Sequence, residues 1–299
     1  MRKIIALCIV LSLMVTVSVN AQKLPDIQET SMRAPAAIKI DGKKVEWDNL
    51  IQAFNKATGI FYTISNDNSD VYLVVKVNAK DLDISNKIIN AGLTFTINGS
   101  GKAKNESGMS ITFPFLYKED HRPNLPLIDY NKEISVWNKQ FTDKAKDIRV
   151  AGIAGIKDTI SIYNPEGIKV VALFGEDAVF TYELAIPLKY LELSVNDPHP
   201  FVYSIKLNGT ANYPYNLTGM DMILTQAGPV PAPTQTPPEF RSARANQVAA
   251  IQHVRSYLRG GIKGMRFEGG NYILDGPTGN IVMGLISPTY FSGEYTLAK

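Results

Sequence analysis

Cysteine is almost absent from this chain of 299 residues, because only Cys8 is present, inside an apolar run near the start. Every later residue therefore lacks a thiol, which excludes an internal disulfide bond and a metal site built on thiolates. The stability of the protein must come from an ordinary hydrophobic core. Residues 22–299 are numerous enough to bury a core of useful size.

Excess charge is also scarce, since 31 lysines and arginines stand against 28 acidic residues, for a formal net charge of +3. Arg2 and Lys3 supply most of that excess. Without them the chain is close to neutral and lacks the dense basic surface that binds phosphate backbones. We therefore expect no nucleic-acid partner.

Long hydrophobic runs are limited to the stretch from Ile4 to Val19, which follows Arg2 and Lys3 and ends at the short residues Asn20 and Ala21. This pattern predicts a secretory signal peptide over residues 1–21 and an exported protein, periplasmic or extracellular. A retained membrane anchor is the alternative, but the run is short for a bilayer span. We expect no transmembrane segment in the mature chain.

Catalytic motifs are missing as well. The three histidines, His121, His199 and His253, lie in different settings without a metal-binding partner at helical spacing. No nucleophile elbow and no phosphate-binding glycine loop occurs. The sequence therefore predicts a protein that is not an enzyme, although a glycosidase-type carboxylate pair need not be adjacent in sequence and stays open.

Short β-rich runs dominate the chain from Ala37 to Leu224 and are separated by clusters of Asn, Asp and Gly. Alternating or β-branched runs of this length indicate strands, and the absence of strand–helix–strand units argues against a parallel sheet. We predict an all-β fold, an antiparallel, jelly-roll-like β-sandwich. The clearest runs are Val71–Val77, Leu93–Ile97, Thr159–Tyr163, Ile168–Phe174, Val179–Ile186 and Phe201–Leu207.

The amino-acid composition changes at Gly228, because five prolines occur between Gly228 and Pro238. We predict a β-sandwich domain over 22–227, a Pro-rich linker with a short basic helix over 228–262, and a β segment over 263–299 that completes the sandwich. The helix is expected between Ala245 and Leu258, where apolar residues recur at helical spacing.

Three separated segments resemble one family. The segments are Ile38–Gly42 with Glu46 and Trp47, Asn66-Asp67 followed by Val71–Val75, and Phe180–Leu188. In order and spacing they are similar to family 9 carbohydrate-binding modules and their DOMON-like relatives. The chain also resembles a group of exported Bacteroidetes proteins. The resemblance covers residues 37–191 and implies a β-sandwich. It also implies sugar binding, commonly between two tryptophans, with structural calcium in some members and haem in others.

Two residues of these segments have a structural interpretation. Trp47 follows an Asp-Gly turn, so its large ring is expected to plug one end of the sandwich. Glu183 lies within an apolar strand, where a carboxylate must be paired or hydrogen-bonded, so we expect it to hold backbone or a basic residue.

Sugar binding requires aromatic ring faces together with amides and carboxylates that fix the hydroxyls. The candidate ligand-binding residues are Trp137 with Tyr130, and the loop residues Asn212, Tyr213, Tyr215 and Asn216. Packing of each ring in the core is the alternative.

Metal and haem sites are also considered. Asp67 and Asp70 belong to an oxygen-rich stretch that suits calcium, with a polar hairpin turn as the alternative and Asp81 and Asp83 as a second candidate. Haem would need axial ligands such as Met109, Met220 or Met222, but no pairing is visible in the sequence.

Together these patterns predict an exported, non-catalytic protein that binds carbohydrate or a cell-envelope glycan, with no required cofactor. A structural or protein-interaction sandwich without a sugar site is the alternative. A haem-binding relative or an undetected glycoside-active enzyme comes third.

Overall fold

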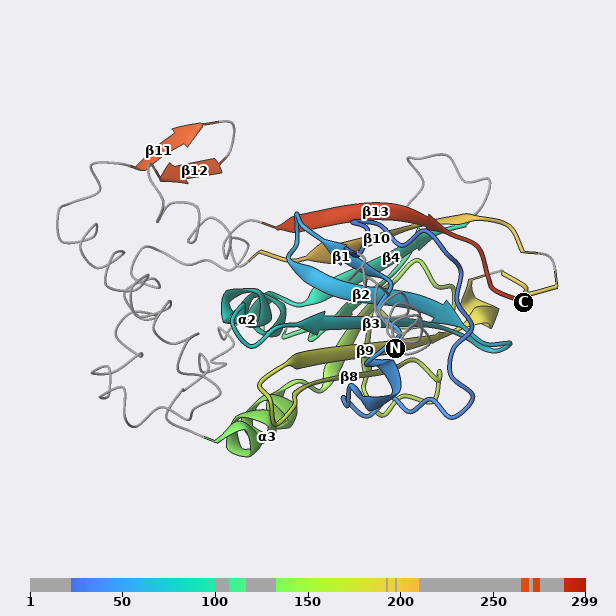
Figure 1. Ribbon diagram of the computed structural model, residues 1–299, viewed down its shortest axis with the longest axis horizontal. Helices are drawn as coiled ribbons and strands as arrows, with labels where there is room; N and C mark the ends of the chain where they lie inside the picture. The colour runs from blue at the N-terminus through green and yellow to red at the C-terminus, as the bar shows by residue number, and fades with distance from the viewer. Residues whose placement is uncertain are drawn as a thin grey trace, which may run out of the picture.

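The computed structural model describes residues 23–99, 108–116, 133–191, 193–196, 198–209, 265–268, 271–274 and 288–299 (Figure 1). The signal peptide predicted over 1–21, and the Pro-rich segment with its basic helix predicted over 228–262, lie outside these residues. Two antiparallel sheets face each other, which confirms the predicted all-β sandwich.

The first sheet has five strands in the order β1-β2-β3-β9-β8, all antiparallel. Its strands are β1 (Ala53–Asn55), β2 (Ile60–Asn66), β3 (Asp70–Val77), β9 (Phe180–Pro187) and β8 (Lys169–Phe174). The short turn at residues 175–179 joins β8 to β9 in an antiparallel hairpin.

The second sheet has six strands in the order β13-β10-β4-β5-β6-β7. Its strands are β13 (Thr289–Tyr295), β10 (Phe201–Leu207), β4 (Leu93–Asn98), β5 (Met109–Phe113), β6 (Asp147–Ala151) and β7 (Thr159–Ser161). A separate hairpin, β11 (Met265–Glu268) and β12 (Asn271–Leu274), pairs only with itself among the described strands.

Helices are few in the described residues. The α-helices are α2 (Leu82–Ala91) and α3 (Ile134–Lys144), and the short 3₁₀ turns are η1 (Val45–Trp47) and η2 (Leu188–Tyr190). Both α-helices lie at the same end of the sandwich in Figure 1. The 3₁₀ turn η2 directly follows Pro187, the last residue of β9.

The core lies between the two sheets and is rich in aromatic rings. Tyr62 from the first sheet meets Tyr203 from the second, with their hydroxyl oxygens 2.9 Å apart, and Phe291 packs against both rings. All three side chains are buried. Because a buried hydroxyl needs a partner, this tyrosine pair fixes how the sheets face each other.

The outer face of the five-stranded sheet is covered by the chain's own N-terminal segment. Trp47 packs there against Tyr72, Val74 and Ala185, and all four are buried. Strand β9 is therefore buried on both faces along seven consecutive residues, whereas each strand of the six-stranded sheet alternates buried and more exposed residues.

Strand β13 closes the other sheet from the far end of the chain. It pairs with β10 along its whole length, with Leu207 opposite Thr289. The amide oxygen of Asn66 in β2 then accepts hydrogen bonds from the Tyr295 hydroxyl, at 3.0 Å, and from the Ala298 N–H, at 2.8 Å. We call this group of contacts the terminal clasp.

Candidate functional site

Glu183 joins two of the sequence segments that carry the family resemblance. One carboxylate oxygen accepts hydrogen bonds from the N–H groups of Asp41, at 2.9 Å, and Gly42, at 2.6 Å. The other accepts from the indole N–H of Trp47 at 2.7 Å. The interpretation of Glu183 is thus confirmed, because its carboxyl group holds backbone and indole. The Trp47 ring is fully buried as expected, but it packs on the outer face of the five-stranded sheet and does not plug one end of the sandwich.

Gly42 makes this arrangement possible. Its φ is +78°, and an added Cβ would lie 2.7 Å from Leu173 Cδ1. A larger residue would thus be strained both by the backbone and by β8. Burial raises the pKa of Glu183 to about 7, although its three N–H partners favour the charged form.

Trp137 belongs to the core and does not offer an open ring. It lies on α3 with 4% of its surface exposed, stacks on Phe141 at 5.9 Å and meets Phe174 edge-on at 4.9 Å. Its indole N–H is buried without a hydrogen-bond partner. The core-packing alternative therefore describes Trp137 in this structure.

The other predicted ligand residues cannot be placed beside it. Tyr130, Asn212, Tyr213, Tyr215 and Asn216 all lie outside the described residues, so their role in sugar binding stays a prediction.

The loop at Asp67 forms the polar hairpin turn between β2 and β3. One Asp67 oxygen accepts from the N–H groups of Ser69, at 2.7 Å, and Asp70, at 2.8 Å, and the other accepts from the Tyr72 hydroxyl at 2.7 Å. Partial burial opposes ionisation, but these hydrogen bonds lower the pKa of Asp67 overall. Burial and the neighbouring Asp67 raise the pKa of Asp70.

In the part of the chain that the structure describes, no group of three His, Asp or Glu residues is arranged for a metal ion. Asp81 precedes α2, and the side chain of Asp83 is outside the description. Met109 is buried on β5, while Met220 and Met222 lie outside the described residues. Calcium at Asp67 and Asp70 stays a prediction.

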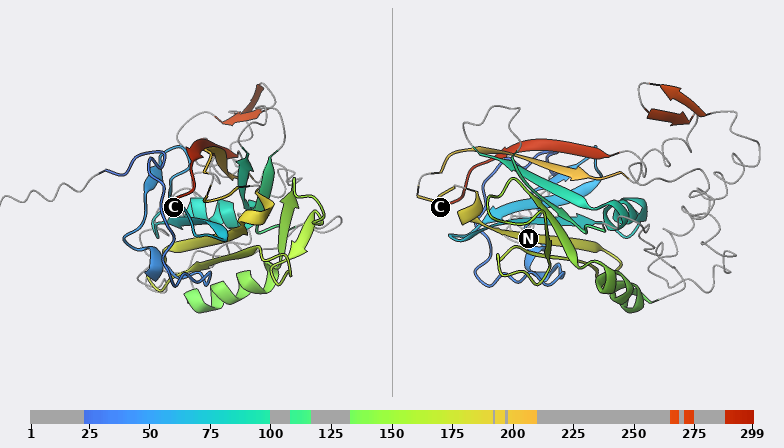
Figure 2. Two further views of the ribbon diagram at one scale, coloured as in Figure 1. Left: turned by 90° about the vertical axis from the view of Figure 1, so that its right-hand side faces the viewer. Right: turned by 180° about the vertical axis from the view of Figure 1, so that it is seen from behind.

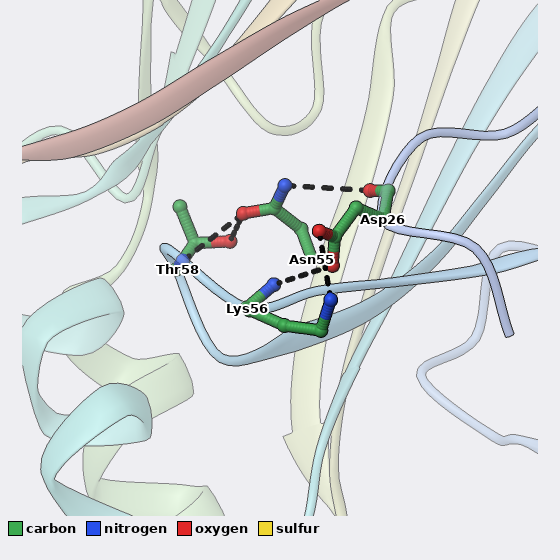
Figure 3. A network of polar contacts seen from close by, with 4 residues as sticks. All are labelled: Asp26, Asn55, Lys56 and Thr58. Atoms are coloured by element: carbon green, nitrogen blue, oxygen red, sulfur yellow. Dashed lines mark hydrogen bonds and ion pairs between the residues drawn. The ribbon is translucent and has the colours of Figure 1, made fainter. Parts of the chain in front are cut away.

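A polar cluster ties the N-terminal segment to the β1–β2 turn (Figure 3). The Asn55 amide oxygen accepts from the Thr58 N–H and hydroxyl, at 3.1 and 2.9 Å, and its amide nitrogen donates to the Asp26 carbonyl at 3.3 Å. Lys56 forms an exposed ion pair with Asp26 at 3.1 Å. Each of these contacts is internal to the fold, so the cluster is structural.

The outer face of the six-stranded sheet differs from that of the five-stranded sheet, because its outward side chains are exposed or half-buried. Seen from behind in the right panel of Figure 2, this sheet faces the viewer. We call this surface the open face. Its strand register sorts the outward side chains into cross-strand rows.

The first row crosses all six strands. It consists of Tyr290, Lys206, Thr94, Thr112, Arg149 and Thr159. Tyr290 is 67% exposed. The hydroxyls of Thr94 and Thr112 are 2.7 Å apart, and the Asn208 side chain donates to Thr94 at 2.9 Å. Arg149 lies over the Phe115 ring at 5.4 Å.

The second and third rows are also polar. The second consists of Ser292, Ser204, Thr96, Ser110 and Ala151. The third holds Glu294, Val202 and Asn98. The open face is therefore rich in hydroxyls, and its edge strand β13 carries the exposed Tyr290 ring.

Sequence reasoning missed this face. The signal was present as the Ser and Thr residues at alternate positions of β4, β5 and β10, but the strand order that brings them together is not local. Comparison with family models and with curated proteins found no match for this chain. Among the described helices, none has the length and apolar character needed to cross a bilayer.

Proposed function

We propose that this protein is an exported, non-catalytic carbohydrate- or envelope-glycan-binding module that uses the open face. The observation that carries the proposal is the contrast between the two sheets. The N-terminal segment covers the outer face of one, whereas the other presents half-buried and exposed hydroxyl residues and the exposed Tyr290 ring.

The chemistry of the open face suits sugars. A pyranose ring stacks its C–H face on an aromatic side chain, which Tyr290 offers. Serine and threonine hydroxyls both donate and accept hydrogen bonds, so the second row can bind the hydroxyls of a glycan chain. Within that row, the Ser204 hydroxyl donates to the Phe291 carbonyl at 3.1 Å and therefore offers its oxygen as an acceptor. Glu294 adds a carboxylate that accepts from sugar hydroxyls.

The extent of the face, with rows of outward side chains that cross several strands, favours a chain over a small molecule. Small ligands are held in concave pockets that cover most of their surface. An open sheet instead contacts one side of an extended polymer. The family resemblance over residues 37–191 and the predicted signal peptide agree with a glycan outside the cytoplasm, in the periplasm or beyond it.

The test is a glycan array probed with residues 22–299, comparing the wild type with Tyr290→Ala. We expect saturable binding that weakens at least tenfold in the variant. Tyr163→Ala is the matched control, since this tyrosine is 79% exposed but follows β7, at the opposite edge of the sheet from β13. Tyr213→Ala on the same array tests the predicted ligand residues outside the described chain.

Three results would change the assignment. Binding to no glycan would favour the alternative of a protein-interaction sandwich. Binding that survives Tyr290→Ala would move the site away from the open face. Release of shortened products from a bound oligosaccharide would restore the glycoside-active alternative.

A further inference from the structure

The open face carries two exposed cations on its first row. Lys206 stands on β10 and Arg149 on β6, and both are exposed. The ion pairs of the described chain involve other lysines: Lys43, Lys44, Lys56, Lys76 and Lys139. Within the described residues, neither Lys206 nor Arg149 forms an ion pair.

The register fixes the spacing of these two cations. Lys206 is opposite Thr94, which is opposite Thr112, which is opposite Arg149. Three strand spacings therefore separate them, or roughly 14 Å between backbones. The hydroxyls of Thr94 and Thr112 lie between the two positive charges, so hydrogen-bonding groups and cations follow one line across the sheet.

The acidic groups of the same face lie off this line. Glu294 belongs to the third row, at the far end of β13. Asp147 is two residues before Arg149 on β6 and is opposite Ser161 in β7. The first row thus has positive charge at two points and no carboxylate of its own.

Arg149 is held in an orientation that suits an anion. The Phe115 ring beneath it stabilises the cation and limits the freedom of its side chain. A planar guanidinium binds a carboxylate or sulfate through paired hydrogen bonds, and Lys206 supplies a second point charge.

We infer that the glycan bound on the open face is an acidic polysaccharide, whose carboxylate or sulfate groups are recognised by Lys206 and Arg149. This inference rests on the proposed function and adds the class of sugar. The polysaccharide chain runs across the strands along the first row. One of its sugar rings stacks on Tyr290, and its hydroxyls lie at Thr94 and Thr112.

The experiment measures binding of residues 22–299 to pectate, alginate, hyaluronate and chondroitin sulfate. Each is compared with its own neutral form, in which the carboxylates are esterified or reduced and the sulfates removed. For at least one polymer we expect the acidic form to bind at least tenfold more tightly, with an advantage that shrinks as salt is added.

Two variants place the site. Lys206→Gln and Arg149→Gln should each remove most of the preference for the acidic form. Lys169→Gln removes the same charge from β8 of the other sheet and should leave the preference unchanged.

The failures of the two proposals are distinguishable. If every polymer binds no better than its neutral form while glycans still bind on the array, the acidic class is overturned and the glycan-binding function stands. Equal binding of polyglutamate overturns recognition of a sugar at this row. Binding of no polymer and no array glycan overturns the proposed function itself.

Discussion

Glu183 combines deep burial with hydrogen bonds from two backbone N–H groups and one indole. Its carboxyl group is the only common partner of the Asp41–Gly42 turn and Trp47 among the described contacts. Two forces oppose each other at this site: burial disfavours the charged form, and the three donors favour it. Burial dominates and raises the pKa to about 7.

Because this pKa is raised in the folded state, the contribution of Glu183 to the free energy of unfolding should decrease as pH rises. A carboxyl group whose folded pKa exceeds its ordinary value of 4.5 contributes stability below that value, and the contribution is lost as pH rises to about 7. The slope is at most about 1.4 kcal/mol per pH unit. Urea unfolding of the wild type and Glu183→Gln between pH 4 and 8 measures it.

The Gln variant serves as the reference because it cannot ionise at this position while every other titrating group is shared. The stability of the wild type minus that of the variant should fall between pH 4.5 and 7 and then level off. A difference that rises with pH would show that the three donors outweigh burial.

The role of a residue was predictable from the sequence only where its neighbours in sequence determine that role. A glutamate inside an apolar strand must be paired, and a tryptophan beside an Asp-Gly turn must pack, so both roles could be read in advance. Trp137 was different, because its ring is covered by Phe174, which comes from a strand distant in sequence. Nothing local to residues 134–138 indicates that contact.

At the scale of elements, two polar contacts in the β1–β2 turn, one made by Asn55 and one by Lys56, differ in how much they stabilise the turn. The Asn55 amide is buried and satisfies three groups, whereas the Lys56–Asp26 ion pair is exposed. Removing a buried partner leaves unsatisfied donors and acceptors, while exposed ion pairs contribute little.

We therefore predict unequal losses from two alanine substitutions in this turn. Asn55→Ala should lower the free energy of unfolding by about 1–3 kcal/mol. Lys56→Ala, one residue away, should lower it by less than about 1 kcal/mol. Chemical denaturation of both variants makes the comparison, and equal losses would contradict this account of the turn.

The strands could be predicted better than the helices. Val71–Val77 and Val179–Ile186 read as strands because β3 and β9 are buried on both faces along most of their length, which produces nearly continuous apolar runs. Helix α3 was not foreseen. Its buried residues include only Trp137 and Phe141, one turn apart, and so few apolar positions give a weak helical period.

At the scale of the whole molecule, the two sheets differ in what covers them. The N-terminal segment shields one sheet, whereas the outward side chains of the other are exposed or half-buried. The fold class followed from the sequence, but this asymmetry did not, because it depends on which strands are neighbours. Strand β10 lies between β4 and β13, both distant in sequence.

The pairing of β10 with β13 predicts that the chain between them can be shortened. Leu207 and Thr289 are opposite each other, and no described strand between them pairs with the sandwich. Replacing residues 209–287 with Gly-Gly leaves a four-residue hairpin loop. We expect the sandwich to form and to gain stability, by at most about 3 kcal/mol from reduced loop-closure entropy.

Circular dichroism and urea unfolding of the shortened chain test this expectation. Loss of the β spectrum would show that residues 209–287 are needed for the fold. A folded but less stable protein would show that they add contacts worth more than the entropy of closing their loop.

The terminal clasp has a consequence for how much of the chain must be present before the protein can fold. Strand β10 lacks one of its two neighbouring strands until Thr289–Tyr295 is present. The Asn66 amide oxygen likewise lacks two hydrogen-bond donors until Tyr295 and Ala298 are present. Until then, β10 is an unpaired strand edge, the kind of surface that joins strands of other chains. The chain must therefore be complete as far as residue 298 before the sandwich can close, so any chain cut short before β13 is prone to aggregate.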